Sequence, residues 1–574
     1  MLKNLTKQTA GYRVAAILTS LFVVMEVMMD VLIPYLMANL IDQGIDASNI
    51  NAIWKWGLIL LGCAVVALFF GVLSGYFAAL ASSGFSRNVR RKMFYTIQDF
   101  SFSNIDTFSS ASLITRLTTD VTNVQRAYQM LIRIAVRSPF MLAFSFFMAT
   151  RINARLALVY LVALPILALG MYFIIKNAYP LFVKVFKIYD KLNSVVQENV
   201  RGVRVVKSFV REEYETEKFK TVSEDIYQNS SKSEKIIAFN SPLMQGIMYL
   251  SILAISYLGA RLIVSNSMTT GQLMSFITYT SQILMSLMML SMVFVMITMS
   301  RASAFRIEEV LSEKSDLTDK EGALVTIADG SLDFESVSFS HTKTADKLCL
   351  KNINLHIASG EVVGIIGSTG SGKSSLVQLI PRLYDVYSGS LKVGGVDVRD
   401  YQIQALRDSV SIVLQKSVLF SGTIKENLRW GNLEATDEQL VAACKISQAD
   451  AFVRSFPKGY DTYIEQDGSN LSGGQKQRLS IARSILKQPK ILILDDSTSA
   501  VDTKTDAHIR RSFRNELKNT TKIIIAQRIN SVMDADKIVV LDEGEIQAIG
   551  THAQLLETSE VYREIYDSQS REEA

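Results

Sequence analysis

Two stretches of the sequence carry residue types that could act on a phosphate group. The first, Gly367-Ser-Thr-Gly-Ser-Gly-Lys-Ser374, follows an apolar run at 361–366 and precedes another at 375–380. Glycines let backbone N–H groups approach phosphate oxygens at a helix N-terminus, the lysine reaches the terminal phosphates, and the serine hydroxyl can ligate Mg²⁺. This strand–loop–helix pattern predicts a phosphate-binding loop formed by Gly367, Ser368, Thr369, Gly370, Ser371, Gly372, Lys373, Ser374 and Ser375.

The second stretch, Ile491-Leu-Ile-Leu-Asp-Asp-Ser-Thr-Ser-Ala-Val-Asp502, runs four apolar residues into two adjacent acids. Such a run is typical of a buried parallel strand, which can present a carboxylate to a metal ion bound with a nucleotide. We therefore predict that Asp495 joins Ser374 at a Mg²⁺ site, directly or through water. The two motifs predict nucleotide binding, but they do not distinguish a kinase, a GTPase and a transport ATPase.

Length and composition limit the classes of protein that could carry these motifs. The chain has 574 residues, too many for one core, and 49% of them are apolar. The net charge of +5 is small for this length, so we expect membrane topology and no nucleic-acid partner. Three scattered cysteines without a CxxC pair argue against a disulfide framework or a zinc site.

The apolar excess lies in the first 300 residues. A helix that crosses a bilayer needs roughly 20 apolar residues, and we count six candidates, at about 14–41, 54–82, 128–150, 155–176, 239–264 and 271–300. The connections 83–127 and 177–238 are polar but contain few Gly or Pro, so we expect helices that continue into the cytoplasm instead of loops.

Basic residues predict the orientation of these spans. Lysines and arginines precede the first span, follow the second, occupy 176–238 and follow the sixth, whereas the opposite loops carry fewer. The positive-inside rule then places both termini in the cytoplasm of a multi-pass protein in a cell membrane. We expect the lipid bilayer to be a partner.

Composition changes after about residue 305, where alternating strand-like runs replace the long apolar ones. Short apolar strands with helices between them indicate a mostly parallel sheet. The predicted fold is therefore a membrane α-helical domain of six long spans over 1–310, a linker over 311–330, and a cytosolic α/β ATPase domain over 331–574.

A third motif narrows the class of nucleotide-binding protein. Asn470-Leu-Ser-Gly-Gly-Gln-Lys-Gln-Arg478 lies roughly a hundred residues after the phosphate-binding loop and just before the two acids. With this motif the sequence resembles the ABC transporter family over nearly its whole length, in the layout of an exporter half-transporter. The segments Leu113–Asp120 and Gly202–Glu212 resemble those beside the family's coupling helices.

The resemblance implies roles for residues that spacing alone does not assign. Lys373 and Ser374 match Walker A, Gln415 the Mg²⁺-sensing Q-loop, Asp495 Walker B and Asp502 the D-loop. Ser472, Gly473, Gly474 and Gln475 match the signature. The family implies ATP and Mg²⁺ as cofactors, with two ATPase domains enclosing two ATP molecules head to tail between one chain's Walker A and the other's signature.

The sequence departs from the family pattern at four places. Asp496 replaces the glutamate that acts as general base, and Gln527 replaces the switch histidine. His341 takes the place of the tyrosine that stacks on adenine, and Gln466-Asp-Gly468 that of Glu-Arg-Gly. A carboxylate displaced by about 1 Å costs roughly 10²-fold in rate, and glutamine cannot shuttle a proton. We expect ATP binding with weak hydrolysis.

This pattern is similar to the degenerate-site subunit of heterodimeric bacterial multidrug exporters. It implies a partner, a second homologous half-transporter with the consensus glutamate and histidine, and small amphipathic drugs or lipids as substrates. A lipid or lipopeptide flippase of the same architecture and an ATP-gated regulatory ABC protein stay open as alternatives. The resemblance further implies a bacterial plasma membrane.

Two features within the spans have no assigned role. Glu26 with Asp30 and Arg133 with Arg137 each share one helix face, and such charges mark a cavity, an ion pair or arginines that snorkel. A methionine stripe of the sixth span suits either helix packing or promiscuous apolar binding; it consists of Met285, Met289, Met292, Met296 and Met299.

Overall fold

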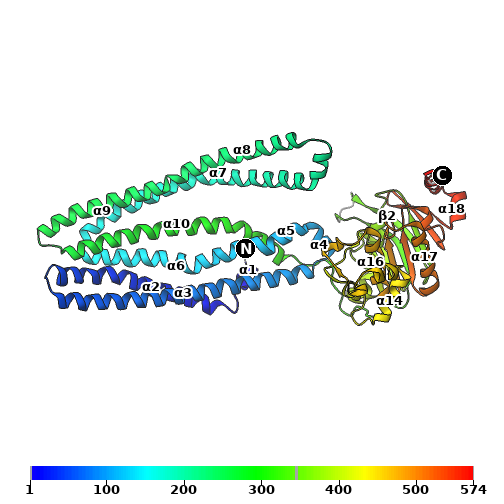
Figure 1. The fold of residues 1–574 in the computed structure, drawn as a ribbon, viewed down its shortest axis with the longest axis horizontal. Coiled ribbons are helices and arrows are strands. Elements are labelled where there is room, and N and C mark those ends of the chain that lie inside the picture. Colours follow the sequence, from blue (N-terminus) through cyan, green and yellow to red (C-terminus); the bar gives the residue numbers. More distant parts are fainter. Residues whose placement is uncertain (1–2, 343–346, 573–574) are drawn as a thin grey trace. The chain divides into compact units, whose positions relative to one another are not determined.

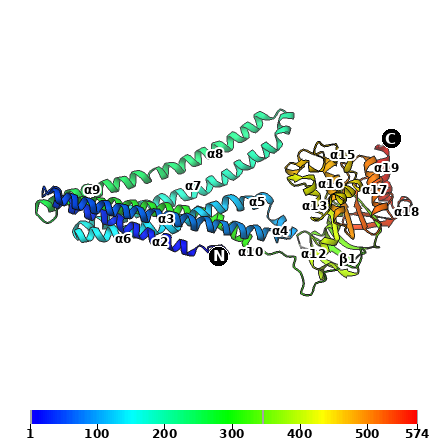
Figure 2. The same ribbon diagram turned by 60° about the horizontal axis from the view of Figure 1, so that its bottom comes forward.

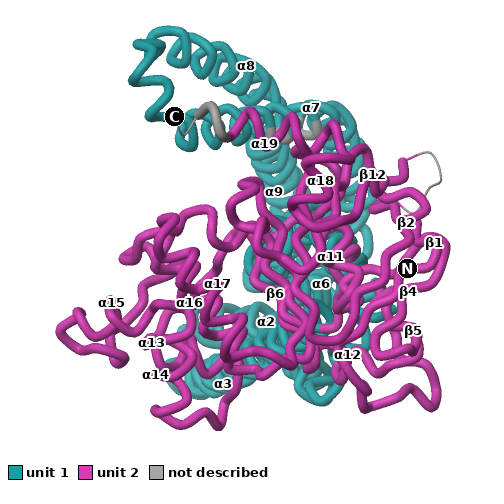
Figure 3. The backbone as a smooth tube through the Cα atoms, turned by 90° about the vertical axis from the view of Figure 1, so that its right-hand side faces the viewer, with its two compact units in different colours: residues 1–98, 111–313 teal, residues 99–110, 314–574 magenta. Residues whose placement is uncertain are grey.

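The computed structural model describes residues 3–342 and 347–572. The chain divides into two compact units (Figure 3), residues 1–98 with 111–313 and residues 99–110 with 314–574. The segment 99–110, which the sequence-based partition placed in the membrane domain, thus belongs to the second unit. Residues 313–331 between the last helix of the first unit and the first strand of the second carry no helix or strand.

Helices build the first unit, and most of them are long (Figure 1). They are α1 (Lys3–Lys7), α2 (Arg13–Leu40), α3 (Ile50–Gln98), α5 (Ser110–Thr115), α6 (Val121–Ile152), α7 (Ala154–Ser208), α8 (Glu212–Ala238), α9 (Asn240–Val264) and α10 (Thr270–Ser312), with π-helical turns η1 (Ile41–Ile45) and η2 (Arg116–Asp120). Within the part of the chain that the structure describes, six helical segments are long and apolar enough to cross a membrane, which confirms the predicted number of spans.

The polar connections are helical, as predicted. The helix α3 continues past the apolar run to Gln98, and α7 and α8 continue the fourth and fifth spans into a long hairpin that turns at 209–211. Figures 1 and 2 show this hairpin extending away from the part of the unit formed by α2, α3, α6 and α10. Helix propensity without Gly or Pro interruptions accounts for the 27 residues of α8.

A buried cluster joins the spans at their loop ends. It contains Val23, Val27 and Val31 of α2, with Tyr160 of α7 and Phe276 of α10 stacked at 5.5 Å between ring centroids. The Tyr160 hydroxyl lies 2.8 Å from the Thr280 hydroxyl, so the polar end of this ring is satisfied. Packing together with satisfied hydroxyls fixes the helices around this cluster.

Of the four charged residues Glu26, Asp30, Arg133 and Arg137 within the spans, three form an ionic bridge. Arg137 on α6 pairs with both Glu26 and Asp30 on α2, the latter at 2.6 Å. Ser74 of α3 donates to Glu26, so three helices meet at this group. Arg137 is therefore ion-paired inside the unit, and the snorkelling interpretation of this arginine is wrong, because it considered α6 without its neighbours.

Among the described residues, the second unit contains three sheets. The largest has the order β12 (Glu545–Gly550), β11 (Lys537–Asp542), β3 (Val362–Ile366), β10 (Thr521–Ile525), β9 (Ile491–Asp495), β6 (Val410–Val413). Its strands are parallel except β12, as predicted for the sheet. A separate antiparallel sheet has the order β2 (Leu350–Ile357), β1 (Leu332–Phe339), β4 (Ser388–Val393), β5 (Val396–Asp397), and β7 (Gly422–Thr423) pairs with β8 (Tyr463–Ile464).

Helices pack around these sheets. They are α4 (Phe102–Thr107), α11 (Lys373–Leu379), α12 (Ile403–Ser409), α13 (Ile424–Arg429), α14 (Asp437–Ile446), α15 (Asp450–Ser455), α16 (Gly473–Leu486), α17 (Thr503–Glu516), α18 (His552–Thr558) and α19 (Glu560–Glu572). Along β9, Ile491 and Ile493 face one hydrophobic core while Leu492 and Leu494 face another. Both faces of the sheet are covered, as expected for parallel strands.

The short helix α4 packs within the second unit. Ser101 caps its N-terminus in a capping box with Asn104. The Phe102 ring lies 6.1 Å from that of Tyr384, whose hydroxyl donates a 2.7 Å hydrogen bond to Asp106. A capped helix with one aromatic and one charge-assisted contact explains why 99–110 belongs with the second unit.

Candidate functional site

The phosphate-binding loop connects the buried strand β3 to α11, which begins at Lys373. Three of its glycines have positive φ: Gly367 at 156°, Gly370 at 88° and Gly372 at 97°. A Cβ on Gly367 would lie 1.9 Å from the carbonyl oxygen of Leu541, so only glycine fits there. The loop tip 368–370 is exposed, which leaves its backbone N–H groups accessible to a phosphate.

Lys373 folds back over this loop. Its ammonium donates to the carbonyl oxygens of Gly367 at 2.9 Å and Ser368 at 2.7 Å. Burial lowers the pKa of Lys373, while the nearby carboxylates of Asp495, Asp496 and Asp542 act against that shift. A cation held beside the loop's own carbonyls is placed to bind the terminal phosphates of a nucleotide.

The two predicted Mg²⁺ ligands meet. The Ser374 hydroxyl donates a 3.0 Å hydrogen bond to Asp495, which ends β9 at the carboxyl edge of the sheet. Burial raises the pKa of Asp495. A hydroxyl and a carboxylate oxygen fit the preference of Mg²⁺ for oxygen ligands, with nucleotide phosphates and water completing its octahedron.

Asp496 joins the predicted Q-loop residue to the predicted switch residue. Its Oδ2 accepts hydrogen bonds from Gln527 at 2.9 Å and from Gln415 at 3.3 Å. Its backbone is left-handed, with φ of 48°, a conformation in which aspartate is enriched among non-glycine residues. Burial raises the pKa of Asp496, and the two amides act against that shift. The structure thus brings together the departures at 496 and 527.

His341 lies beside the end of the phosphate-binding loop. Its Nε2 lies 3.3 Å from the Ser375 hydroxyl. Its ring meets those of Phe339 and Tyr384 edge to face, at 4.8 Å and 5.1 Å between centroids. An imidazole supported by two aromatic rings is in a position to contact a base attached to a phosphate in the loop.

The signature residues form the N-terminus of α16. Ser472 caps this helix in a capping box with Gln475, leaving the N–H groups of its first turn directed at the same end. A Cβ on Gly474 would lie 2.8 Å from the Ala500 carbonyl oxygen. In the described part of the chain, no hydrogen bond connects 472–475 to 367–375, so this signature and this phosphate-binding loop act as separate surfaces.

Two residues contribute to the site that the sequence did not single out. Asp542 accepts a 2.6 Å hydrogen bond from Ser368, and it follows an apolar strand much as Asp495 does, a signal that could have identified it. Gln477 accepts from the Ala500 backbone at 3.0 Å and links α16 to the D-loop. Asp502 was predicted as the D-loop aspartate, and its carboxylate caps α17 by accepting from Thr505 at 2.9 Å.

Comparisons with known proteins agree with this geometry. The family description "ABC transporter transmembrane region" matches residues 16–301, and "ABC transporter" matches residues 350–499. An uncharacterized ABC transporter ATP-binding protein of Bacillus subtilis, YfiB, is 36% identical over 97% of both chains. Another from Mycobacterium tuberculosis, Rv1273c, is 34% identical over 94% of this chain and 93% of the relative.

Two further comparisons concern named proteins. The ATP-dependent lipid A-core flippase of Desulfotalea psychrophila is 32% identical over 93% of both chains. A solved bacterial Atm1-family ABC exporter with ATP bound has the same fold, with a TM-score of 0.82 and 23% identity, over 98% of this chain and 99% of that one. Motifs, six membrane-spanning helices and relatives together show that the chain belongs to the ABC transporter family, as a multi-pass half-transporter of the exporter type with an ATP-binding domain.

Proposed function

We propose that the chain is one subunit of a heterodimeric ATP-driven exporter. In this proposal it binds ATP and Mg²⁺ through Lys373, Ser374 and Asp495 but hydrolyses that ATP poorly. Its intact signature completes the active site of a second, homologous half-transporter that carries glutamate and histidine at the positions of Asp496 and Gln527.

The observation that carries the proposal is the Asp496 group. The side chains that correspond to the general base and the switch are hydrogen-bonded to each other at 2.9 Å, and the Q-loop glutamine binds the same carboxylate oxygen. A general base must be free to accept a proton from water. The Asp496 side chain is one methylene shorter than glutamate, and its carboxylate already accepts hydrogen bonds from two amides. The residues that we expect to bind ATP and Mg²⁺ are all present in the sequence. We therefore propose that the chain binds ATP but hydrolyses it poorly.

The placement of the signature supports a two-chain site. Ser472 and Gln475 lie at the N-terminus of a 14-residue helix, where N–H groups and the helix dipole favour a phosphate. No hydrogen bond within the described residues directs these groups to this chain's own phosphate-binding loop. A second chain arranged head to tail would bring its nucleotide to them.

For the substrate we propose small amphipathic molecules, drugs or lipids. Met285, Met292 and Met299 are each more than half exposed on α10, and packing within this chain does not cover them. Flexible, polarizable side chains adapt to varied apolar ligands. Lipid transport is the second candidate, favoured by the likeness to a relative that is named a lipid A-core flippase. We place the transporter in a bacterial plasma membrane with both termini in the cytoplasm.

Restoring the consensus tests the proposal. The double variant Asp496→Glu with Gln527→His should hydrolyse ATP faster than wild type by up to roughly 10²-fold, because the base regains its reach and the switch can carry a proton. The measurement is phosphate release by the purified chain, with dimer formation checked by size. The control Asp495→Asn in the restored background should abolish the gain, because the metal loses its carboxylate.

Two results would contradict the proposal. Brisk hydrolysis by the wild-type chain alone would show that Asp496 supports catalysis as it stands. An unchanged rate in the double variant, with nucleotide binding intact, would show that the departures at 496 and 527 are not what limits hydrolysis.

A further inference from the structure

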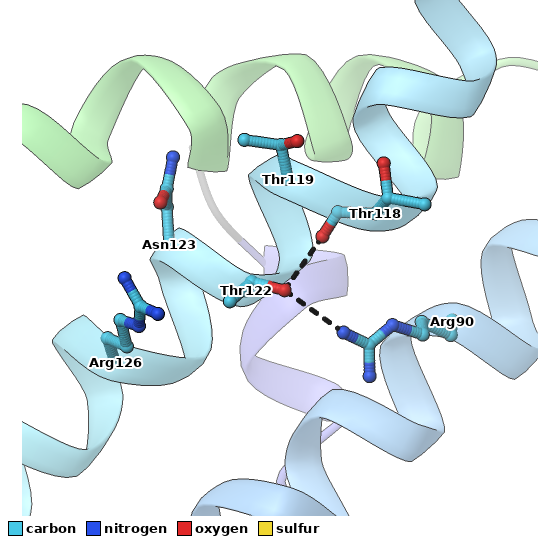
Figure 4. Close-up of a pocket in the computed structure, with 6 residues that line it drawn as sticks. All are labelled: Arg90, Thr118, Thr119, Thr122, Asn123 and Arg126. Atoms are coloured by element: carbon cyan, nitrogen blue, oxygen red, sulfur yellow. Dashed lines mark hydrogen bonds between the residues drawn. The ribbon is translucent and has the colours of Figure 1, made fainter.

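A basic pocket lies between α3 and α6 in the first unit, far along the chain from the nucleotide motifs. It has a volume of about 420 Å³ and is lined by Arg90, Thr118, Thr119, Thr122, Asn123 and Arg126. Figure 4 shows the two arginines on either side of Thr122, one from each helix. No acidic side chain belongs to this lining.

The π-helical turn η2 shapes the α6 side of the pocket. Its two charged residues, Arg116 and Asp120, are buried and point to α10, where Asp120 accepts from Arg306 at 2.7 Å and from Ser303 at 2.7 Å. Thr118 and Thr119 between them are exposed and line the pocket. The Asp120 carboxylate is therefore bonded to α10, on the side of the turn away from the pocket. π-helical turns within α-helices occur frequently at functional sites.

The arginines retain capacity to bind an anion. Arg90 donates to Ser86 at 2.6 Å, to the Leu117 carbonyl at 3.3 Å and to Thr122 at 3.2 Å. A guanidinium has five N–H donors, so two remain. Arg126 is exposed, and among the described residues it makes no hydrogen bond or ion pair. Two unneutralised guanidinium groups with hydroxyls between them match the oxygens of a phosphate.

The position along the helices places this pocket at the edge of the bilayer. Arg126 lies two residues before the apolar run that begins at 128, or about 3 Å along the helix. Arg90 lies eight residues after the run that ends at 82, or about 12 Å. The headgroup layer is roughly 5–8 Å thick on each side, so the Arg126 backbone lies within this layer and the Arg90 backbone lies a few Å beyond it, a distance that a long arginine side chain can cover. Basic pockets between membrane helices suit anionic headgroups.

We propose that this pocket is a binding site for a phosphate group, which bridges α3 and α6 through Arg90, Thr122 and Arg126. The phosphate of an anionic lipid and free phosphate in solution share this chemistry. Both sources would contact the same two arginines, and they differ in whether the group arrives from the bilayer or from water.

Lipid retention measured by native mass spectrometry tests the first source. The full-length chain is released from nanodiscs of phosphatidylcholine with and without phosphatidylglycerol. Wild type should retain phosphatidylglycerol, and Arg126→Gln should retain it about tenfold less, since one charge-assisted hydrogen bond is lost. Arg90→Gln should act in the same direction. Arg91→Gln is the matched control, because Arg91 is exposed on α3 outside the pocket lining.

Thermal melting in phosphatidylcholine nanodiscs tests the second source, with inorganic phosphate added at millimolar concentration. A rise in melting temperature for wild type and Arg91→Gln, but not for Arg126→Gln, would support the site with a soluble ligand. Arg126 has no partner within the described chain, so its variant should fold normally, and its melting temperature without ligand checks this. The proposal is overturned if Arg126→Gln and Arg90→Gln match wild type with both probes, or if Arg91→Gln loses as much.

Discussion

Asp496 places a negative charge where burial disfavours it and two amides partly compensate. Its pKa is raised mainly by loss of solvation, with hydrogen bonds from Gln415 and Gln527 acting in the opposite direction. Because the folded-state pKa exceeds the unfolded one, the folded protein binds this proton more tightly. The contribution of Asp496 to stability is therefore greatest below the unfolded pKa and is lost as pH rises through the folded pKa.

The variant Asp496→Asn should reveal the energetic cost of burying the Asp496 carboxylate. Removing the charge should raise the melting temperature of the nucleotide-free protein at pH 7.5, and the gain should shrink towards pH 4.5, because protonation of Asp496 in the folded wild type removes the same charge. Thermal melting at the two pH values measures it. Asp437→Asn is a control of opposite sign, because the hydrogen bond from Lys425 lowers the pKa of Asp437. A gain for Asp496→Asn that does not change with pH would contradict the argument.

At the scale of elements, η2 is attached to α10 by two ion pairs, each with one buried and one more exposed partner. The Asp120 side chain is 1% exposed and pairs with Arg306, which is 47% exposed, whereas Arg116 is 10% exposed and pairs at 2.7 Å with Glu309, which is 57% exposed. Asp120 also accepts from Ser303, so neutralising it weakens its bonds to two donors, whereas Arg116 without Glu309 still donates to the Arg306 carbonyl oxygen. The two carboxylates thus differ in burial and in the number of bonds that depend on them.

We predict that Asp120→Asn lowers the stability of the purified transporter by about 2–3 kcal/mol. Glu309→Gln should cost less than about 1 kcal/mol. Melting in detergent should show a drop of about 5 °C or more for the first variant and little for the second. Equal drops for both would show that burial does not decide the strength of these links.

Sequence alone predicted the elements well where the signal is local. Six apolar runs became six membrane-spanning helices, and the glycine loop lies between strand and helix as expected. Contacts between distant segments could not be predicted. Arg137 pairs with two acids of α2, and Tyr384 bonds to Asp106. No periodic pattern in the sequence indicates either contact. The π-helical turn at 116–120 was likewise not predicted.

The same division holds for the candidate site. The types and spacing of Lys373, Ser374 and Asp495 predicted that they would meet, because carboxyl ends of parallel strands share one edge. The departures at 496 and 527 were visible as residue types, but their mutual hydrogen bond was not. It arises because β9 and β10 are adjacent in the sheet, which sequence order does not give.

At the scale of the whole molecule, the proposed heterodimer assigns two surfaces of this chain to two different ATP sites. The phosphate-binding loop with Asp496 would serve the weak site, and the signature at the start of α16 would serve the partner's strong site. Damage to the signature should then reduce turnover strongly, whereas loss of the Asp496 carboxylate should change it little. A homodimer of this chain predicts no such asymmetry, because both surfaces would belong to two equivalent sites.

We therefore expect Ser472→Arg in this chain to reduce ATP turnover of the assembled transporter by roughly 10²-fold, because the side chain blocks the helix N-terminus that binds the partner's nucleotide. Asp496→Asn should change it by less than about twofold, since its carboxylate is not the working base. Phosphate release by the co-purified pair measures both. Loss of the serine cap costs only about 1 kcal/mol, so Ser472→Arg should still assemble. A large loss for Asp496→Asn with little for Ser472→Arg would assign catalysis to this chain's own site and remove the basis for the asymmetric pair.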